Sequence, residues 1–181
     1  MILQYCPATG RADFDVAEDL RLSGDHVGED AQRQPIRVLI VCTHNAARSQ
    51  MAEALLRWMA GEAVEVYSAG TEPTAVHPLT IRVLEELGIQ TSGLRAKSVE
   101  EFLGQTFDYV ITVCDQARER CPVFPGGEQI HWSFPDPSTV EGSEAERLEA
   151  FRNVRDAIAQ RLRLWVSVIL RDQQRGPVTL R

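Results

Sequence analysis

Cys42 and Arg48 stand at the two ends of one seven-residue segment, and Ser49 follows directly. The apolar run at 36–41 predicts a buried strand that leads into the cysteine, and the apolar spacing of 48–60 predicts a helix that begins at the arginine. A loop between a strand and a helix directs backbone N–H groups and the positive end of the helix dipole at one point. The segment therefore predicts a site for a tetrahedral oxyanion, and the same field is expected to lower the pKa of the cysteine.

The residue types in this loop fit nucleophilic chemistry on a bound anion. The planar guanidinium of Arg48 is able to hold two oxygens, and the Ser49 hydroxyl is placed to donate to the Cys42 sulfur. Asn45 tolerates left-handed backbone angles and is expected to support the loop through side-chain hydrogen bonds. The alternative is a buried structural cysteine beside an incidental arginine, but the strand–loop–helix context favours anion binding. The predicted oxyanion-binding residues are Thr43, His44, Asn45, Ala46, Ala47 and Arg48.

A second pair of thiols, Cys114 and Cys121, is separated by seven positions. In a regular helix this spacing is two turns, about 10 Å along the axis. A disulfide needs Cα atoms within about 7 Å, so the segment must partly unwind if the two cysteines pair. Two alternatives remain: both cysteines are simply buried apolar residues, or they bind zinc together with His131. The spacings fit no common zinc finger or ribbon.

Asp136 lies between two prolines and is therefore held on a stiff loop. A protonated carboxyl group there is placed to give a proton to a leaving oxygen, which is general acid catalysis. An Asp before a Pro is also a common turn or helix cap. The position alone does not choose between the two roles.

The composition limits the classes of protein to consider. The 181 residues suffice for one domain with a core, and the net charge of −7 without a basic stripe argues against nucleic acid as a partner. No apolar run approaches the roughly 20 residues that cross a bilayer, and no signal peptide pattern is present at the N-terminus, so we expect no membrane partner. These features predict a cytoplasmic, reducing location, where cysteines more often serve catalysis or metal binding than structural disulfides.

Residues 1–35 differ from the remainder, because seven acidic residues and three arginines give them a net charge of −4. They predict an acidic, mobile extension in which Cys6 is incidental, although 13–20 would also form a short amphipathic helix. The compact domain is predicted at 36–170 and a loose tail at 171–181.

Strands and helices alternate within the domain. This order predicts an α/β fold, a doubly wound four-stranded parallel sheet with helices on both faces. The predicted strands are 36–41, 64–69, 107–113 and 130–134, and the predicted helices are 48–60, 77–87, 98–102 and a long final helix that includes 148–169. Ligands bind beyond the carboxyl ends of such strands, so the Cys42 loop, Cys114 and the segment after Phe134 are expected on one edge.

Residues 42–53, CTHNAARSQMAE, resemble the signature loop and first helix of the low-molecular-weight tyrosine phosphatases. They resemble still more closely the related thioredoxin-coupled arsenate reductases. Gln50, where the phosphatases usually have proline, and the second cysteine pair favour the reductases. Two positions depart from the family pattern: His44 stands where glycine is common, and Ala47 stands where many relatives carry a cysteine. The resemblance covers about 36–165, and its other marks are YSAG at 67–70, VC at 113–114, CP at 121–122 and HWSFPDP at 131–137.

This resemblance implies reduction of arsenate to arsenite, for arsenic detoxification, by a relay of Cys42, Cys114 and Cys121. Arg48 would hold the oxyanion, which phosphate or sulfate would imitate, and Asp136 would act as the acid. The implied electron donor is thioredoxin, or a glutaredoxin-like protein, and no cofactor is tightly bound.

Two other functions compete with this prediction. A phosphatase would hydrolyse phosphomonoesters through a phospho-cysteine at Cys42, and it has no use for the second cysteine pair. A non-enzymatic oxyanion sensor needs neither a nucleophile nor a proton donor.

Three polar residues raise the question of a bound potassium ion. Glu53 and Ser68 resemble positions that help to bind potassium in some relatives, whereas Lys97 offers a fixed positive charge instead. His131 and Trp132 are predicted to be packing residues.

Overall fold

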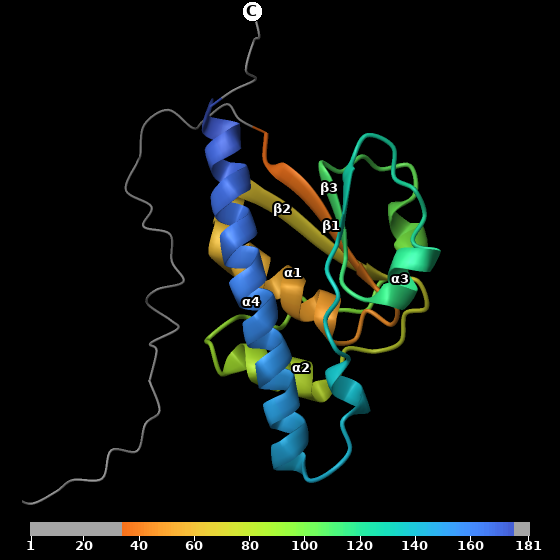
Figure 1. The fold of residues 1–181 in the computed structure, drawn as a ribbon, viewed down its shortest axis with the longest axis vertical. Coiled ribbons are helices and arrows are strands. Elements are labelled where there is room, and N and C mark those ends of the chain that lie inside the picture. Colours follow the sequence, from red (N-terminus) through yellow and green to blue (C-terminus); the bar gives the residue numbers. More distant parts are fainter. Residues whose placement is uncertain (1–33, 176–181) are drawn as a thin grey trace, which may run out of the picture.

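A parallel sheet of four strands forms the centre of the fold in the computed structural model, which describes residues 34–175. The strand order is β2-β1-β3-β4, and every neighbouring pair is parallel, which confirms the predicted fold class (Figure 1). The strands are β1 (Ile36–Cys42), β2 (Val64–Gly70), β3 (Tyr109–Thr112) and β4 (Glu128–His131).

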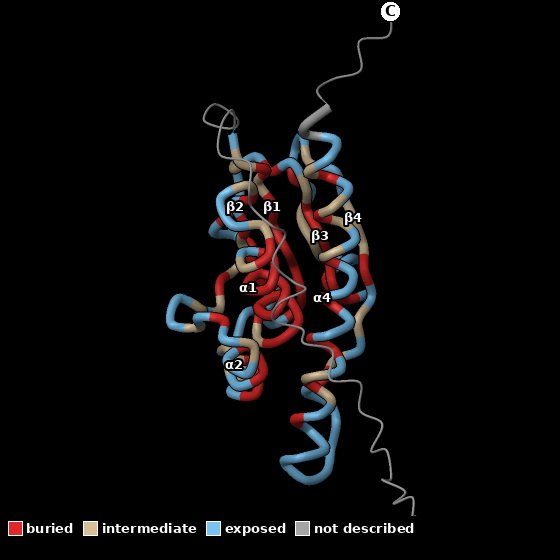
Figure 2. Tube along the Cα trace, turned by 90° about the vertical axis from the view of Figure 1, so that its left-hand side faces the viewer, coloured by how far each residue is buried: buried red, intermediate tan, exposed pale blue. Residues whose placement is uncertain are grey.

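Helices cover both faces of the sheet. Figure 1 shows α1 (Arg48–Ala60), α2 (Pro78–Glu85) and α4 (Glu144–Arg175) on one side and the short α3 (Asp115–Arg120) on the other. The apolar run of β1 is enclosed between these layers, so Val38, Leu39, Ile40 and Val41 have no exposed surface. Figure 2 shows this burial as red along most of β1 and the first part of α1. Such burial on both faces is the reason why a central parallel strand is apolar throughout.

Local signals place several helix boundaries correctly. The turn after α2 ends at Gly88, whose φ of 69° suits glycine, and Ile89 N donates to Leu84 O there. The predicted capping box is present: Glu100 N donates to Ser98 Oγ, and Ser98 N donates to the Glu101 carboxylate. The element that follows is a 3₁₀ turn, Val99–Phe102.

Two predicted boundaries are wrong. The fourth strand lies at Glu128–His131, earlier than the predicted 130–134, because its first two residues are exposed on an edge strand and leave no apolar signal. The predicted tail at 171–181 begins too early, because α4 continues to Arg175 with Ile169 buried against the core. The predicted extension lies almost entirely outside the described residues, as does Cys6.

The topology places chemistry at one edge of the sheet. The chain passes from β1 to β2 on one side and then returns to β3 on the other side of β1, so the crossover directions diverge at the carboxyl end of β1. Cys42 is the last residue of β1, and Cys114 follows two residues after β3. Within residues 34–175, none of the helices has the length and apolar character needed to cross a membrane.

Candidate active site

The loop after β1 is anchored through its carbonyl groups. The carbonyls of Cys42, Thr43 and His44 accept hydrogen bonds from the segment that follows β2, at 3.1, 2.8 and 3.0 Å, and Ala46 O accepts from His77 N at 2.9 Å. A peptide unit directs its N–H opposite to its C=O, so this anchoring leaves the N–H groups of the loop facing the other way. Asn45 N shows that direction, because it donates to the Cys42 sulfur at 3.1 Å. We call this loop, residues 43–48, the cradle; its Asn45 N–H group faces the Cys42 sulfur, the direction that a site for an oxyanion requires.

Gly70, at the end of β2, permits the close approach of this loop. A Cβ atom at Gly70 would lie 2.7 Å from Thr43 O and 3.0 Å from Asn45 N, closer than real Cβ contacts.

We expect Gly70→Ala to displace the loop, with a loss of about 2 kcal/mol in the free energy of unfolding and a loss of about tenfold in affinity for phosphate. Thermal unfolding and calorimetric titration with phosphate measure both effects. Gly93→Ala is the matched control, because a Cβ at Gly93 would meet no atom within 4 Å. Equal behaviour of the two variants would contradict the close-approach argument.

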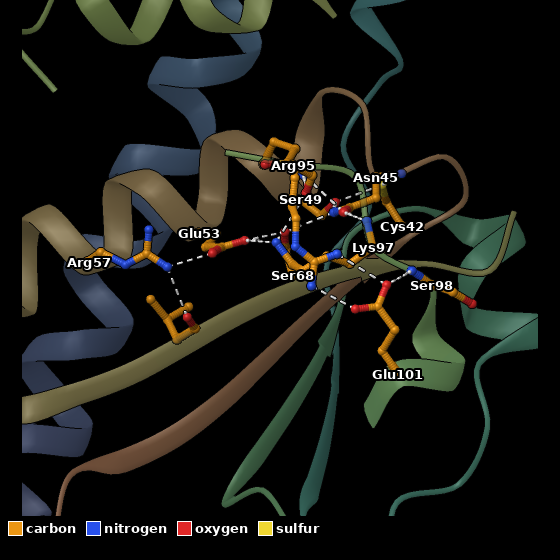
Figure 3. A network of polar contacts seen from close by, with 12 residues as sticks. Cys42, Asn45, Ser49, Glu53, Arg57, Ser68, Arg95, Lys97, Ser98 and Glu101 are labelled. Carbon is orange, nitrogen blue, oxygen red and sulfur yellow. Dashed lines mark hydrogen bonds and ion pairs between the residues drawn. The ribbon is translucent and has the colours of Figure 1, made fainter. Parts of the chain in front are cut away.

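Asn45 fixes the loop from within, as predicted, with a left-handed φ of 49°. Its Oδ1 accepts from Lys97 N at 2.8 Å, so its amide nitrogen must be the donor to Ser49 Oγ and Ser68 Oγ, each at 2.8 Å (Figure 3). Because Ser49 Oγ already accepts a hydrogen bond from Asn45, its own hydroxyl hydrogen is free to be donated to the Cys42 sulfur, 2.9 Å away.

The pKa of Cys42 differs from the expectation. Burial raises the pKa of this thiol above its ordinary value, and the nearby Cys114 acts in the same direction. Hydrogen bonds from Ser49 and Asn45 act in the opposite direction without overcoming burial. The correction has a simple cause: the sequence indicates the donors around the sulfur, whereas the loss of water around it depends on the packing of the whole fold.

We expect Ser49→Ala to raise the pKa of Cys42 further, because the thiolate loses a donor that stabilises it. A raised pKa leaves less thiolate at neutral pH, so reaction with a small thiol reagent slows by about tenfold there and recovers as the pH rises. The ultraviolet absorbance of the thiolate, titrated with Cys42→Ser protein as the blank, measures the shift. Ser92→Ala is the control at an exposed serine. A titration curve unchanged by Ser49→Ala would exclude the serine as the donor.

Arg48 and Asp136 contact each other directly. Arg48 Nη2 forms an ion pair with Asp136 Oδ2, and Nη1 donates to Phe134 O at 3.2 Å. The other Asp136 oxygen accepts from Ser138 N at 3.0 Å, so the aspartate also caps the turn Pro137–Thr139. Burial alone would raise the pKa of Asp136, but the Ser138 hydrogen bonds and the charges of Arg48 and His44 outweigh it and lower the pKa. In this arrangement the carboxylate is ionised at neutral pH.

The two remaining cysteines flank α3. Cys114 is buried, and its sulfur lies 3.3 Å from Thr43 Oγ1 in the cradle. Cys121, at the other end of the helix, is half-buried beside a cavity of about 360 Å³ that is also lined by His131 and Val123. Burial raises the pKa of Cys121 to about 11, so this thiol is protonated at neutral pH. All three described cysteines are free thiols.

The sequence model of the low molecular weight phosphotyrosine protein phosphatases matches residues 37–175, nearly the whole described fold. The chain belongs to this family. Among its relatives, the arsenate reductase of Halalkalibacterium halodurans is 38% identical over 127 residues, which are 70% of this chain and 91% of the relative.

Two solved structures are similar to this chain in fold and sequence. The thioredoxin-dependent arsenate reductase of Corynebacterium glutamicum has a TM-score of 0.60 and 34% identity, and the match covers 77% of this chain and 64% of that one. An arsenate reductase in the phosphate-binding state has a TM-score of 0.61 and 31% identity, with 74% of this chain and 98% of that chain covered.

Behind the phosphatase-family loop, a buried ion pair supports Asn45. Lys97 Nζ donates to Glu53 Oε2 at 3.0 Å, and Ser68 Oγ donates to the same oxygen (Figure 3). Lys97 and Glu53 are 7% and 4% exposed, so both charges are removed from water. Arg57 holds the other Glu53 oxygen at 2.5 Å.

Some contacts have no signal in the sequence. Gln50 Nε2 donates to Asn45 Oδ1 at 2.9 Å and to Arg95 O at 2.7 Å, which gives a structural role to the residue that had only marked the family. The Thr43–Cys114 contact joins residues 71 positions apart. Among residues 34–175, no three His, Cys, Asp or Glu side chains come together to hold a metal ion. Cys114, Cys121 and His131 are accordingly not gathered into one group in the described part of the chain.

Proposed function

We propose that this protein reduces arsenate to arsenite through Cys42, Cys114 and Cys121. One observation carries the proposal: the second thiol, Cys114, lies against Thr43 of the cradle that surrounds the first, and the third stands at the far end of the same short helix. Arsenate reductases recur among the relatives and the solved structures that resemble this chain. A hydrolytic phosphatase has no chemical use for the second and third thiols.

The first step joins sulfur to arsenic. The Cys42 thiolate attacks arsenate while the N–H groups of the cradle and Arg48 hold its oxygens. A hydroxyl group leaves the arsenic with a proton from Asp136, and water is released. Arsenic remains As(V) in this adduct.

The second step transfers the electrons. The Cys114 thiolate attacks the Cys42 sulfur, and the electron pair of the S–As bond stays on arsenic, which leaves as arsenite, As(III). Cys121 then attacks the Cys114 sulfur and releases the Cys42 thiolate. The dithiol of thioredoxin reduces the final Cys114–Cys121 disulfide, so the sum is arsenate plus thioredoxin dithiol to arsenite, thioredoxin disulfide and water. The Corynebacterium glutamicum relative supports thioredoxin as the donor. A relay of free thiols fits a reducing compartment, so the location that we propose is the cytoplasm.

Substrate binding has to change the partner of Arg48. The Arg48–Asp136 ion pair keeps the carboxyl group ionised, and an ionised carboxylate donates no proton. An oxyanion that takes the guanidinium leaves Asp136 beside a negative charge, which favours its protonated form. We therefore assign Asp136 both roles that its position suggested, as the cap of the turn at rest and as the acid during the reaction.

We further propose that Lys97 supplies the positive charge beside Glu53 that a bound potassium ion would otherwise supply. Its ammonium group lies within hydrogen-bonding distance of Glu53 and shares the Glu53 oxygen with Ser68. Glu53, Ser68 and Asn45 are thereby held in place by a charge that belongs to the chain itself.

An assay coupled to NADPH tests the proposal, with arsenate as substrate and with thioredoxin and thioredoxin reductase supplied. We expect arsenate-dependent NADPH oxidation by the unaltered protein and none by Cys42→Ser. Hydrolysis of a phenyl phosphate without NADPH oxidation would establish the phosphatase instead. Binding of arsenate and phosphate without NADPH oxidation and without phosphate ester hydrolysis would establish the non-enzymatic oxyanion sensor.

A further inference from the structure

A chain of hydrogen bonds joins the first residue of α3 to the edge strand. Thr112 Oγ1 and His131 Nδ1 are 2.8 Å apart, and His131 Nε2 lies 3.0 Å from Asp115 Oδ1. Ser133 Oγ donates to the other Asp115 oxygen at 3.3 Å. Asp115 directly follows Cys114 in the sequence, so this chain reaches the residue beside the thiol that must move. We call Asp115, His131 and Ser133 the α3 clasp.

The remaining restraints on α3 are few. The helix has six residues, too short to be stable by its own hydrogen bonds. Within the helix, the side chain of Ala117 is buried, Gln116 contacts Thr43 at 3.3 Å, and Arg120 forms an exposed ion pair with Glu72. Beyond the helix, Val123 is 86% exposed, whereas Phe124 is buried against Phe107. Both ends of α3 are therefore held by a small number of side-chain contacts, and the clasp is the set that bears directly on Cys114.

The clasp bears on the relay because a disulfide cannot span the intact helix. The two cysteines flank the six-residue helix at positions seven apart, a spacing that corresponds to about 10 Å of helical rise, whereas paired Cα atoms lie within about 7 Å. If Cys114 moves toward Cys121, Asp115 moves with it and its two hydrogen bonds break. If only the Cys121 end moves, the clasp remains intact.

We infer that His131 and Ser133, through Asp115, position Cys114 toward the cradle, and that the clasp opens when the Cys114–Cys121 disulfide forms. The inference rests on the proposed function, because it assigns a structural cost to one step of that relay. His131 is then a positioning residue, not only the packing residue that its sequence context predicts. The clasp stabilises the dithiol and opposes the disulfide.

The dithiol–disulfide equilibrium tests this inference without arsenate. The protein is equilibrated with mixtures of reduced and oxidised dithiothreitol, which exchange with its Cys114–Cys121 dithiol and disulfide. Alkylation followed by peptide mapping measures the fraction of each form. The full chain with Cys42→Ser is the background, since it isolates the second cysteine pair. The variants are Asp115→Ala, His131→Phe and the double variant. Glu119→Ala is the control, because Glu119 is an exposed acid of the same helix and forms no ion pair with the residues described in the structure.

We expect half-reduction of each single variant to need a ratio of reduced to oxidised dithiothreitol about threefold higher than in the background protein. This corresponds to a reduction potential of the Cys114–Cys121 disulfide about 14 mV more negative. The shift is modest because the Asp115 side chain is 75% exposed, and exposed pairs are weak. The double variant should also shift about threefold, not about ninefold, since both changes break one linkage. Midpoints equal to that of Glu119→Ala, or additive shifts, would overturn the clasp while the relay stands. Failure to form the Cys114–Cys121 disulfide at any ratio would overturn both.

Discussion

The Cys121→Ser variant is expected to release about one arsenite per protein molecule and then stop. In the proposed relay Cys42 and Cys114 suffice to transfer two electrons, so the first turnover would be complete without the third thiol. The Cys42–Cys114 disulfide then remains, because no thiol is left in the site to attack Cys114. Multiple-turnover activity should fall by at least about 10³-fold, the scale on which the loss of a nucleophile acts.

Rapid quench with quantification of arsenite distinguishes this burst from steady turnover. Cys114→Ser is the companion variant and should release no arsenite, since its Cys42–arsenic adduct has no attacking thiol. Steady turnover by Cys121→Ser would show that thioredoxin reduces the Cys42–Cys114 disulfide directly, and the third member of the relay would be wrong.

The pKa of Cys121, about 11 in the resting structure, adds a further expectation. Its thiol should react slowly with alkylating reagents at neutral pH until the 114–121 segment moves.

Glu53→Gln is expected to lower the free energy of unfolding by about 3 kcal/mol, because the substitution leaves an uncompensated buried charge at Lys97. For a protein of this size the melting temperature should fall by about 10 °C. Glu53 also accepts from Ser68 and Arg57, so the change disturbs the side chains that support Asn45. We therefore expect the affinity of the loop for anions to fall as well.

The double variant Glu53→Gln, Lys97→Met separates charge from packing. It removes both charges, so it should recover most of the stability that the single variant loses. Thermal and urea unfolding measure the effect, with Glu62→Gln as the control at an exposed glutamate. If the single and double variants are equally unstable, the buried pair is not the source of the loss.

The cradle was predictable from sequence because it is local. Strand, loop and helix follow one another within 36–60, so the apolar pattern around Cys42 and Arg48 was enough to place both residues. The edge strand was misplaced for the converse reason: Glu128 and Gln129 are exposed, and pairing with β3 depends on a neighbour far away in the chain.

The partners of the site residues could not be read from the sequence. The ion pair of Arg48 with Asp136 joins residues 88 positions apart, and that of Lys97 with Glu53 joins residues 44 positions apart. The direction of the Cys42 pKa was wrong because hydrogen-bond donors are local, whereas burial comes from every layer of the fold. Sequence indicates which groups do chemistry, and tertiary packing sets their protonation at rest.

The Arg48–Asp136 ion pair also bears on selectivity. Asp136 acts as an internal competitor, since every tetrahedral anion that enters must first displace the same carboxylate from the same guanidinium. The free energy of that displacement is common to arsenate, phosphate and sulfate, so it weakens all three equally and separates none of them. This displacement therefore contributes nothing to discrimination, whereas the step in which the central atom accepts two electrons from sulfur separates arsenate from the other two anions. Phosphate would be an inhibitor that occupies the cradle, and arsenate the anion that leaves it reduced.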